Sequence, residues 1–238
     1  PASEIYVGMK LKKSQEVGMD GSLHRLPENV KQEGVIKLIE ELNSDNNVNG
    51  ILVQLPLPKH LNERKILDTI SPEKDVDGLT TLNMGNLFSG SAAFEPCTPK
   101  GIIKMLDAEG FEFEGKNAVV IGRSNIVGKP IAMMLMKKNA TVTMCHSRTK
   151  NLSDHTKNAD ILVVAIGKSK FITEDMVKTG ATVIDVGMNR TDKGLFGDVD
   201  FEKVKEKTHF ITPVPGGVGP LTVAMVLENT IISAERKL

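Results

Sequence analysis

The chain has 238 residues, 40% of them hydrophobic and 25% charged, so it is long enough to bury one large hydrophobic core or two modest ones. Thirty basic residues balance thirty acidic ones, which excludes a net field that would attract nucleic acid or an anionic membrane. With no apolar run of about eighteen residues and no metal-ligand spacing among its two cysteines and five histidines, we expect no membrane span, no metal and a reduced, cytoplasmic protein.

The chain opens with segments of helical spacing. We expect a first helix that ends near Gly18 or Gly21, and a second over residues 35–45. A short apolar run closed by prolines follows over 48–58 and predicts a buried strand, with Gln54 near its carboxyl end.

An acidic turn then separates two further helices. The first covers residues 62–70, and the turn SPEKDVDGL follows it, punctuated by Pro72 and Gly78. The stretch EPCTPKGIIKMLDAEG starts the second helix, in which we expect Thr98 to be the N-cap and Pro99 to lie in the first turn.

The second half alternates short apolar runs with helix-length segments. This alternation predicts an α/β fold with a doubly wound parallel sheet. The five runs expected to form strands are 117–122, 140–146, 160–167, 181–187 and 209–215. The amphipathic stretch 221–238 predicts a C-terminal helix of about four to five turns.

A glycine-containing loop follows the first of these runs. In IGRSNIVGKPIAMMLMKKNA, Gly122 and Gly128 bracket a turn between a strand and a helix, and Pro130 lies in the first helical turn. Such a loop lets backbone approach a pyrophosphate, and the helix N-terminus offers unpaired N–H groups. The glycine pair alone is weak evidence, but the strand before it and the helix after it favour a dinucleotide site.

The tip of the second strand indicates which dinucleotide is bound. NAD-binding folds carry an acid there that bonds the ribose 2′-hydroxyl, whereas CHSRTK has no acid and presents Ser147 and Arg148. With Arg123 these side chains suit a 2′-phosphate, so the sequence favours NADP over NAD. Loop arginines are more often simply solvated, but two of them flanking a dinucleotide turn favour binding.

Tyr6 and Lys10 lie one helical turn apart near the start of the chain. Taken alone, such a pair is typical of an amphipathic helix, with the tyrosine half-buried and the lysine reaching solvent. The same spacing marks short-chain dehydrogenases, but there it follows the dinucleotide loop, whereas here it precedes it. Gln54, taken alone, is equally well explained as a polar residue that ends a buried strand.

Six motifs in order give these residues a different meaning. YVGMK, GILVQLPLP, EKDVDGL, PCTPKG, GRSNIVGKP and TPVPGGVGPLTVAM resemble the bifunctional methylenetetrahydrofolate dehydrogenase/methenyltetrahydrofolate cyclohydrolase family over essentially the whole chain. The resemblance implies a folate-binding catalytic domain over 1–98 plus 221–238, a Rossmann-like NADP domain over 99–220, and a cleft between them. Family members carry a further strand and helix before PASEIYVGMK, so we expect that segment to be missing here.

The resemblance also implies a reaction. It is the NADP-dependent oxidation of 5,10-methylenetetrahydrofolate to the 5,10-methenyl form and hydrolysis of the latter to 10-formyltetrahydrofolate, in one-carbon metabolism and purine biosynthesis, by an enzyme that is usually a homodimer. Hydride transfer mainly requires geometry, whereas hydrolysis requires proton transfers that a lysine of lowered pKa can supply.

By resemblance, four residues carry the chemistry. Lys10 matches the catalytic lysine, Gln54 the residue that holds it, Tyr6 the ring that stacks on folate, and Asp77 the carboxylate that pairs with the amino and ring N–H edge of the pterin. Asp75, in the same turn as Asp77, is expected to cap its own loop.

The resemblance implies further contacts to both ligands. PVPGGVGPLT, taken alone, reads as a tight turn between domains, but in the family it lines the folate and nicotinamide sites. The remaining substrate contacts are Ser3, Val53, Leu55, Pro215, Gly216, Gly217, Val218, Gly219 and Thr222. The cofactor contacts are Gly122, Arg123, Ser124, Ile126, Val127, Ser147, Arg148 and Met188.

Three alternatives stay open at this point. The chain could be a dehydrogenase alone, a dehydrogenase of another small molecule such as shikimate or an amino acid, or a catalytically silent NADP-binding protein. Lys10 and Gln54 argue against the first, and Tyr6 and Asp77 against the second.

Overall fold

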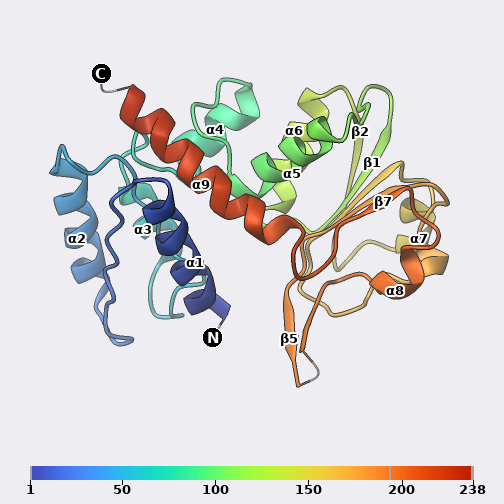
Figure 1. The fold of residues 1–238 in the computed structure, drawn as a ribbon, viewed down its shortest axis with the longest axis horizontal. Helices are drawn as coiled ribbons and strands as arrows, with labels where there is room; N and C mark the ends of the chain where they lie inside the picture. Colours follow the sequence, from blue (N-terminus) through green and yellow to red (C-terminus); the bar gives the residue numbers. More distant parts are fainter. Residues whose placement is uncertain (1, 193, 237–238) are drawn as a thin grey trace. The chain divides into compact units, whose positions relative to one another are not determined.

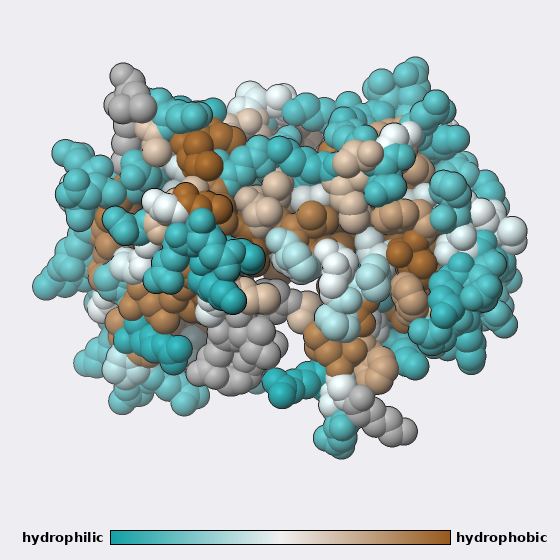
Figure 2. Space-filling view, in the orientation of Figure 1, coloured by the Kyte–Doolittle hydropathy of each residue, from teal (hydrophilic) through white to brown (hydrophobic). Residues whose placement is uncertain are grey.

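The computed structural model describes the backbone of residues 2–192 and 194–236, and the side chains of these residues from Val7 onward. Contacts divide the chain into two compact units, each described by itself. Unit 1 comprises Pro1–Cys97 with Val223–Leu238, and unit 2 comprises Thr98–Thr222. Hydrophilic residues cover much of the face drawn in Figure 2. None of the described helices is long and apolar enough to cross a membrane.

Unit 1 is built mainly from helices (Figure 1). They pack around an aliphatic core. The helices expected near the start, over 35–45 and over 62–70 are confirmed, and one short helix was not expected. The helices are α1 (Ala2–Glu16), α2 (Gln32–Ser44), α3 (Glu63–Thr69), α4 (Thr81–Ser89) and the later part of α9 (Val218–Glu235). The apolar faces of α2 and α3 supply Val35, Ile39, Ile66 and Leu67 to the core.

The strand expected over residues 48–58 is not formed. Only an isolated parallel bridge joins Ile51 to Asp75, with the amide of Ile51 donating to the carbonyl oxygen of Lys74 at 2.7 Å. Residues 52–54 form no further ladder, and a longer strand would also have met Pro56 and Pro58, which have no N–H to donate. The apolar residues of this run nevertheless pack into the core of unit 1, as buried strand residues would.

A buried lysine closes the end of α2. Lys74 is only 6% exposed. Its ammonium group donates to three carbonyl oxygens at the end of α2, those of Leu42 (2.9 Å), Asn43 (2.6 Å) and Asp45 (2.7 Å). The last carbonyls of a helix have no partner within the helix, and the negative end of the helix dipole favours a cation there. Lys74 therefore joins α2 to the turn that carries Asp75 and Asp77.

The end of α9 is tied to the same turn of unit 1. Asn229 is fully buried, and its side-chain amide donates to the carbonyl oxygens of Val76 (2.8 Å) and Glu95 (3.2 Å). One turn further on, the hydroxyl of Ser233 contacts the carbonyl oxygens of Asn49 and Glu73.

Unit 2 contains a five-stranded parallel sheet in the order β2-β1-β3-β4-β7, which confirms the predicted doubly wound arrangement (Figure 1). The strands are β1 (Asn117–Ile121), β2 (Thr141–Cys145), β3 (Ile161–Val164), β4 (Thr182–Asp185) and β7 (Phe210–Ile211). The helices are α5 (Cys97–Ala108), α6 (Gly128–Lys137), α7 (Leu152–Thr156), α8 (Phe201–Val204) and the short 3₁₀ helix η1 (Glu174–Met176). An antiparallel hairpin of β5 (Asn189–Thr191) and β6 (Gly194–Phe196), not expected from the sequence, stands apart from the sheet.

Two helix starts differ from expectation. Because α5 begins at Cys97, Thr98 lies inside the helix rather than at its N-cap, and its hydroxyl pairs with that of Thr222 at 2.9 Å. The C-terminal helix begins at Val218, three residues before the expected start at Leu221.

The strand order fixes where a ligand can bind in unit 2. Ile121 at the end of β1 is paired with Cys145 on β2 and with Val164 on β3, so the three strands end at one edge. The chain leaves β1 toward β2 on one side and returns to β3 on the other. Open α/β sheets bind ligands outside the carboxyl ends of the strands at such a switch point, here between β1 and β3.

Candidate active site and cofactor loop

Lys10 and Gln54 meet in unit 1. Lys10 lies on α1 and is half-buried, and its ammonium nitrogen Nζ donates to Gln54 Oε1 at 3.1 Å. The other end of the Gln54 amide donates to the carbonyl oxygen of Leu55 at 3.0 Å. The glutamine is thus held by its own chain and aims an acceptor at the lysine.

The electrostatics of this site favour proton transfer. Burial lowers the pKa of Lys10, and the negative charges of Asp77 and Cys97 only partly oppose it. Burial likewise raises the pKa of Asp77, against the effects of Lys10 and of a hydrogen bond from Cys97. The lysine therefore gives up its proton, and the carboxyl takes one, more readily than in water.

Cys97 is a member of this cluster that the sequence did not single out. It is buried, and its thiol contacts the carbonyl oxygen of Val76 at 3.1 Å, directly before Asp77. The only available signal was its place in the PCTPKG motif.

Asp75 holds the loop that carries Asp77. Its buried carboxylate accepts hydrogen bonds from the amides of Leu79 (3.1 Å) and Thr80 (2.8 Å) and from the side chain of Asn83 (2.8 Å). The expectation that Asp75 caps its own loop is confirmed, although the donors lie four and more residues ahead rather than in a tight Asx turn.

In unit 2, Gly122 turns the chain sharply after β1. Its φ is +122°, and a Cβ atom there would lie 2.3 Å from the carbonyl oxygen of Ala165. The glycine is therefore required by the close approach of the chain after β3, a reason within the protein that the sequence did not reveal.

The loop after Gly122 fits an anionic group. The hydroxyl oxygen of Ser124 accepts from the amides of Val127 (3.2 Å) and Gly128 (3.3 Å), which start α6. Within the described part of the chain, the amides of residues 123–126 donate to no protein acceptor. Consecutive free amides before a helix N-terminus suit a phosphate.

The side chains expected to read the cofactor surround this edge of the sheet. Arg123, Ser124 and Ile126 are exposed, whereas Val127 is buried and offers only backbone. Ser147 and Arg148 are exposed at the tip of β2, where no acid lies. Met188, 37% exposed, follows β4.

The loop after β3 also borders the candidate cofactor site, although the sequence motifs did not point to it. Residues 165–168 follow directly on β3, and β3 borders the switch point. In the sequence, this loop is marked only by Gly167, the glycine that ends the run DILVVAIG.

Other expected substrate residues are placed as follows. Val53 and Leu55 are half-buried and pack against the core of unit 1. Residues 215–222 begin with a turn in which the amide of Gly217 donates to the carbonyl oxygen of Pro213 at 2.9 Å. The side chains of Ser3 and Tyr6 lie outside the described residues.

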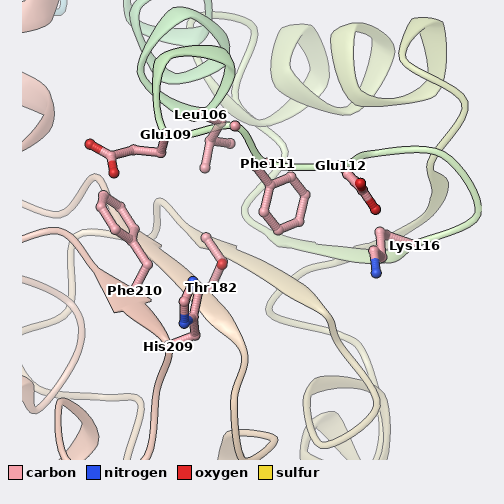
Figure 3. Close-up of a pocket in the computed structure, with 9 residues that line it drawn as sticks. Leu106, Glu109, Phe111, Glu112, Lys116, Thr182, His209 and Phe210 are labelled. Atoms are coloured by element: carbon pink, nitrogen blue, oxygen red, sulfur yellow. The ribbon is translucent and has the colours of Figure 1, made fainter.

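A hollow in unit 2 lies at the opposite, amino-terminal edge of the sheet. Figure 3 shows Phe111, His209 and Phe210 around it, together with Lys116 and Glu112. A neighbouring hollow shares several of these residues. Their lining mixes acids, bases and phenyl rings, and Lys116 precedes β1 whereas a cofactor requires the carboxyl ends of the strands. This hollow therefore lies away from the edge at which a cofactor is expected.

The chain is similar to known proteins over almost its whole length. The tetrahydrofolate dehydrogenase/cyclohydrolase catalytic domain matches residues 1–77, and the corresponding NAD(P)-binding domain matches residues 96–238. The chain is 58% identical to the bifunctional protein FolD of Thermodesulfovibrio yellowstonii over 98% of its own length and 82% of the relative.

Two solved structures are also similar. The bifunctional FolD enzyme of Campylobacter jejuni is 51% identical, with a TM-score of 0.97 over 100% of this chain and 85% of that one. The methylenetetrahydrofolate dehydrogenase-cyclohydrolase of Trypanosoma brucei, solved with NADP and an inhibitor, is 38% identical, with a TM-score of 0.95 over 99% of this chain and 83% of that one.

Proposed function

Because the chain belongs to the tetrahydrofolate dehydrogenase/cyclohydrolase family, we propose a division of its chemistry between unit 1, which binds the folate, and unit 2, which binds NADP. The enzyme oxidises 5,10-methylenetetrahydrofolate with NADP and hydrolyses the resulting methenyl compound to 10-formyltetrahydrofolate, in one-carbon metabolism. The bifunctional reading is favoured over a dehydrogenase alone because the names of the Campylobacter jejuni and Trypanosoma brucei proteins give both activities and the Thermodesulfovibrio yellowstonii protein is named bifunctional.

We propose that the oxidation depends mainly on how the protein places the folate and the cofactor relative to each other. NADP, when bound, accepts the hydride. The loop amides of residues 123–126 and the start of α6 hold its phosphates, and Ser147, Arg148 and Arg123 receive the 2′-phosphate. Asp77 pairs with the donor edge of the pterin, and Tyr6 stacks on the ring. No strong base is needed, because the folate nitrogen lone pair expels the hydride.

The hydrolysis requires proton transfers, which we assign to Lys10. In its neutral form the amine takes a proton from the water that attacks the methenyl carbon, and it returns that proton to the ring nitrogen as the carbon–nitrogen bond breaks. Water and the methenyl cation thus become the 10-formyl product and one released proton. Gln54 holds the amine for this step.

The observation that carries this proposal is the half-buried Lys10, bonded to Gln54 at 3.1 Å and with its pKa lowered by burial. We expect the purified protein to reduce NADP with 5,10-methylenetetrahydrofolate and to convert added methenyltetrahydrofolate, followed by the absorbance of the reduced cofactor and of the methenyl group. A protein that reduces NADP but leaves the methenyl compound at its uncatalysed rate would support a dehydrogenase alone. Failure of both reactions would support a silent NADP-binding protein.

The 2′-phosphate pocket has its own test. Replacing Arg123 by Ala removes a charge-assisted contact, so the KM for NADP should rise about 10- to 100-fold while the KM for NAD changes little. Steady-state rates with both cofactors measure this. Arg25→Ala, at an exposed arginine of unit 1, should change neither the KM for NADP nor the KM for NAD. An unchanged preference in the Arg123 variant would exclude the pocket.

We propose further that the enzyme acts as a homodimer in the cytoplasm. Leu82 (57% exposed) and Phe88 (75% exposed) on α4 are large apolar side chains that a second chain would cover. Within the described residues neither Cys97 nor Cys145 forms a disulfide, as is usual in a reducing compartment. Light scattering should give twice the mass of one chain, and cell fractionation should find the protein with cytoplasmic markers. A single-chain mass, or recovery from another fraction, would exclude the corresponding proposal.

A further inference from the structure

Two buried carboxylates lie at the cofactor edge of unit 2, and the chemistry above does not use them. Asp185 is the last residue of β4 and is 3% exposed, and Asp198, shortly after β6, is fully buried. Neither forms an ion pair with a side chain in the described part of the molecule. Buried carboxylates are costly unless their oxygens are well bonded, so the partners of these two are informative.

Asp198 binds the backbone of the loop that follows β3. One of its oxygens accepts from the amides of Ile166 (2.7 Å) and Gly167 (2.9 Å), and the other accepts from the amide of Lys168 (2.7 Å). The second oxygen also accepts from the side chain of Asn189 (2.8 Å). One side chain therefore fixes three consecutive amides at the switch point and joins them to the segment after β4.

Asp185 fixes the other side of the same edge. Its carboxylate accepts from the amide of Gly187 (2.9 Å), which precedes Met188, and from the amides of Asp198 and Val199, each at 2.9 Å. The contact is too close for a side chain on the intervening loop, because a Cβ atom on Gly187 would lie 2.2 Å from the carboxyl carbon of Asp198.

The donors around both carboxylates are almost all backbone amides. An amide side chain cannot replace a carboxylate here, because its NH₂ group would face an N–H donor. Burial raises the pKa of Asp185 to about 6, and the nearby charge of Asp198 adds to this, so the three amide bonds only partly offset the cost of the charge. The main effect of such an arrangement is to hold the loops in one geometry, and its net contribution to the free energy of unfolding is small.

On the basis of the proposed NADP site, we infer that Asp198 and Asp185 are positioning residues for the cofactor. Asp198 holds residues 166–168, and Asp185 holds Gly187, directly before Met188, in the arrangement that receives bound NADP. They act on cofactor binding and leave hydrolysis of the methenyl compound, which needs no cofactor, unaffected.

The test separates cofactor binding from hydrolysis. In Asp198→Asn we expect the Kd for NADP, measured by titration calorimetry, to rise at least about tenfold through loss of aligned loop amides. The KM for NADP should rise in parallel, while hydrolysis of added methenyltetrahydrofolate stays at the wild-type rate. Asp200→Asn, a buried aspartate two residues on that faces Lys170 and Lys203, is the matched control and should bind NADP normally.

Two outcomes overturn the inference. A folded Asp198→Asn protein that binds NADP as tightly as wild type excludes it, and so does an equal loss of NADP binding in the Asp200 control. If Asp198→Asn does not fold, the test uses Asn189→Ala, which removes only one donor to Asp198. We expect this variant to bind NADP more weakly than wild type, and unchanged binding would contradict the inference. A wild-type protein that fails to bind NADP would instead refute the proposed function.

Discussion

Replacing Lys10 by Met should lower the rate of methenyltetrahydrofolate hydrolysis at least about 100-fold, the usual scale of general acid–base catalysis, while hydride transfer to NADP keeps much of its rate. Methionine keeps the length of the side chain but can neither accept nor donate the proton. The hydride step depends on ligand placement rather than on this proton. Both rates can be read from one reaction mixture, from the reduced cofactor and from the methenyl absorbance.

The pH dependence gives a second readout for Lys10. Only the neutral amine can accept a proton, so wild-type hydrolysis should increase with pH through a lysine pKa that burial has placed below the ordinary 10.5. The Lys10→Met protein should lack this rise. Lys12→Met, at an exposed lysine of the same helix, should retain both activities and the profile. Equal retention of both activities in the Lys10 variant would refute its assigned role.

Replacing Lys74 by Met should lower the free energy of unfolding by about 3 kcal/mol, because three carbonyl oxygens at the end of α2 lose their shared donor in a buried site. For a chain of this size such a loss lowers Tm by about 6–12 °C. Thermal unfolding followed by circular dichroism measures the change, and hydrolysis of the methenyl compound reports on unit 1 specifically.

Lys37 on α2 offers a matched control. Its side chain is 78% exposed and reaches Glu41 at 4.0 Å, an arrangement worth less than about 1 kcal/mol. Lys37→Met should therefore unfold close to the wild-type temperature. A Lys74 variant as stable as the Lys37 variant would mean that water, and not the lysine, satisfies the end of α2.

The sequence identified the parallel sheet because its central strands β1, β3 and β4 are short, mostly apolar runs that are almost wholly buried, between segments of helical length. The short elements were harder to predict. The ends of α4 carry a real signal, since the Thr80 hydroxyl accepts from the amide of Asn83 and Gly90 adopts a left-handed conformation. The hairpin strands have three residues each, too few to show a period.

The candidate site was predictable only in part. Lys10, Gln54 and Asp77 stood in motifs whose order carried information, although 44 positions separate the lysine from its glutamine partner. Cys97, Asp185 and Asp198 owe their surroundings to burial and to contacts with residues distant in sequence. No local pattern encodes such contacts, so their environment became visible only in the folded chain.

The path of α9 has a consequence for how the protein is made. Unit 2 ends at Thr222, so all of its residues are available before residues 223–238 are synthesised. Unit 1 has to wait for that segment, because Asn229 and Ser233 supply its bonds to the chain around Val76 and Glu73. During translation unit 1, although begun before unit 2, is therefore completed after it, and premature termination between Thr222 and Asn229 would leave unit 1 without these bonds.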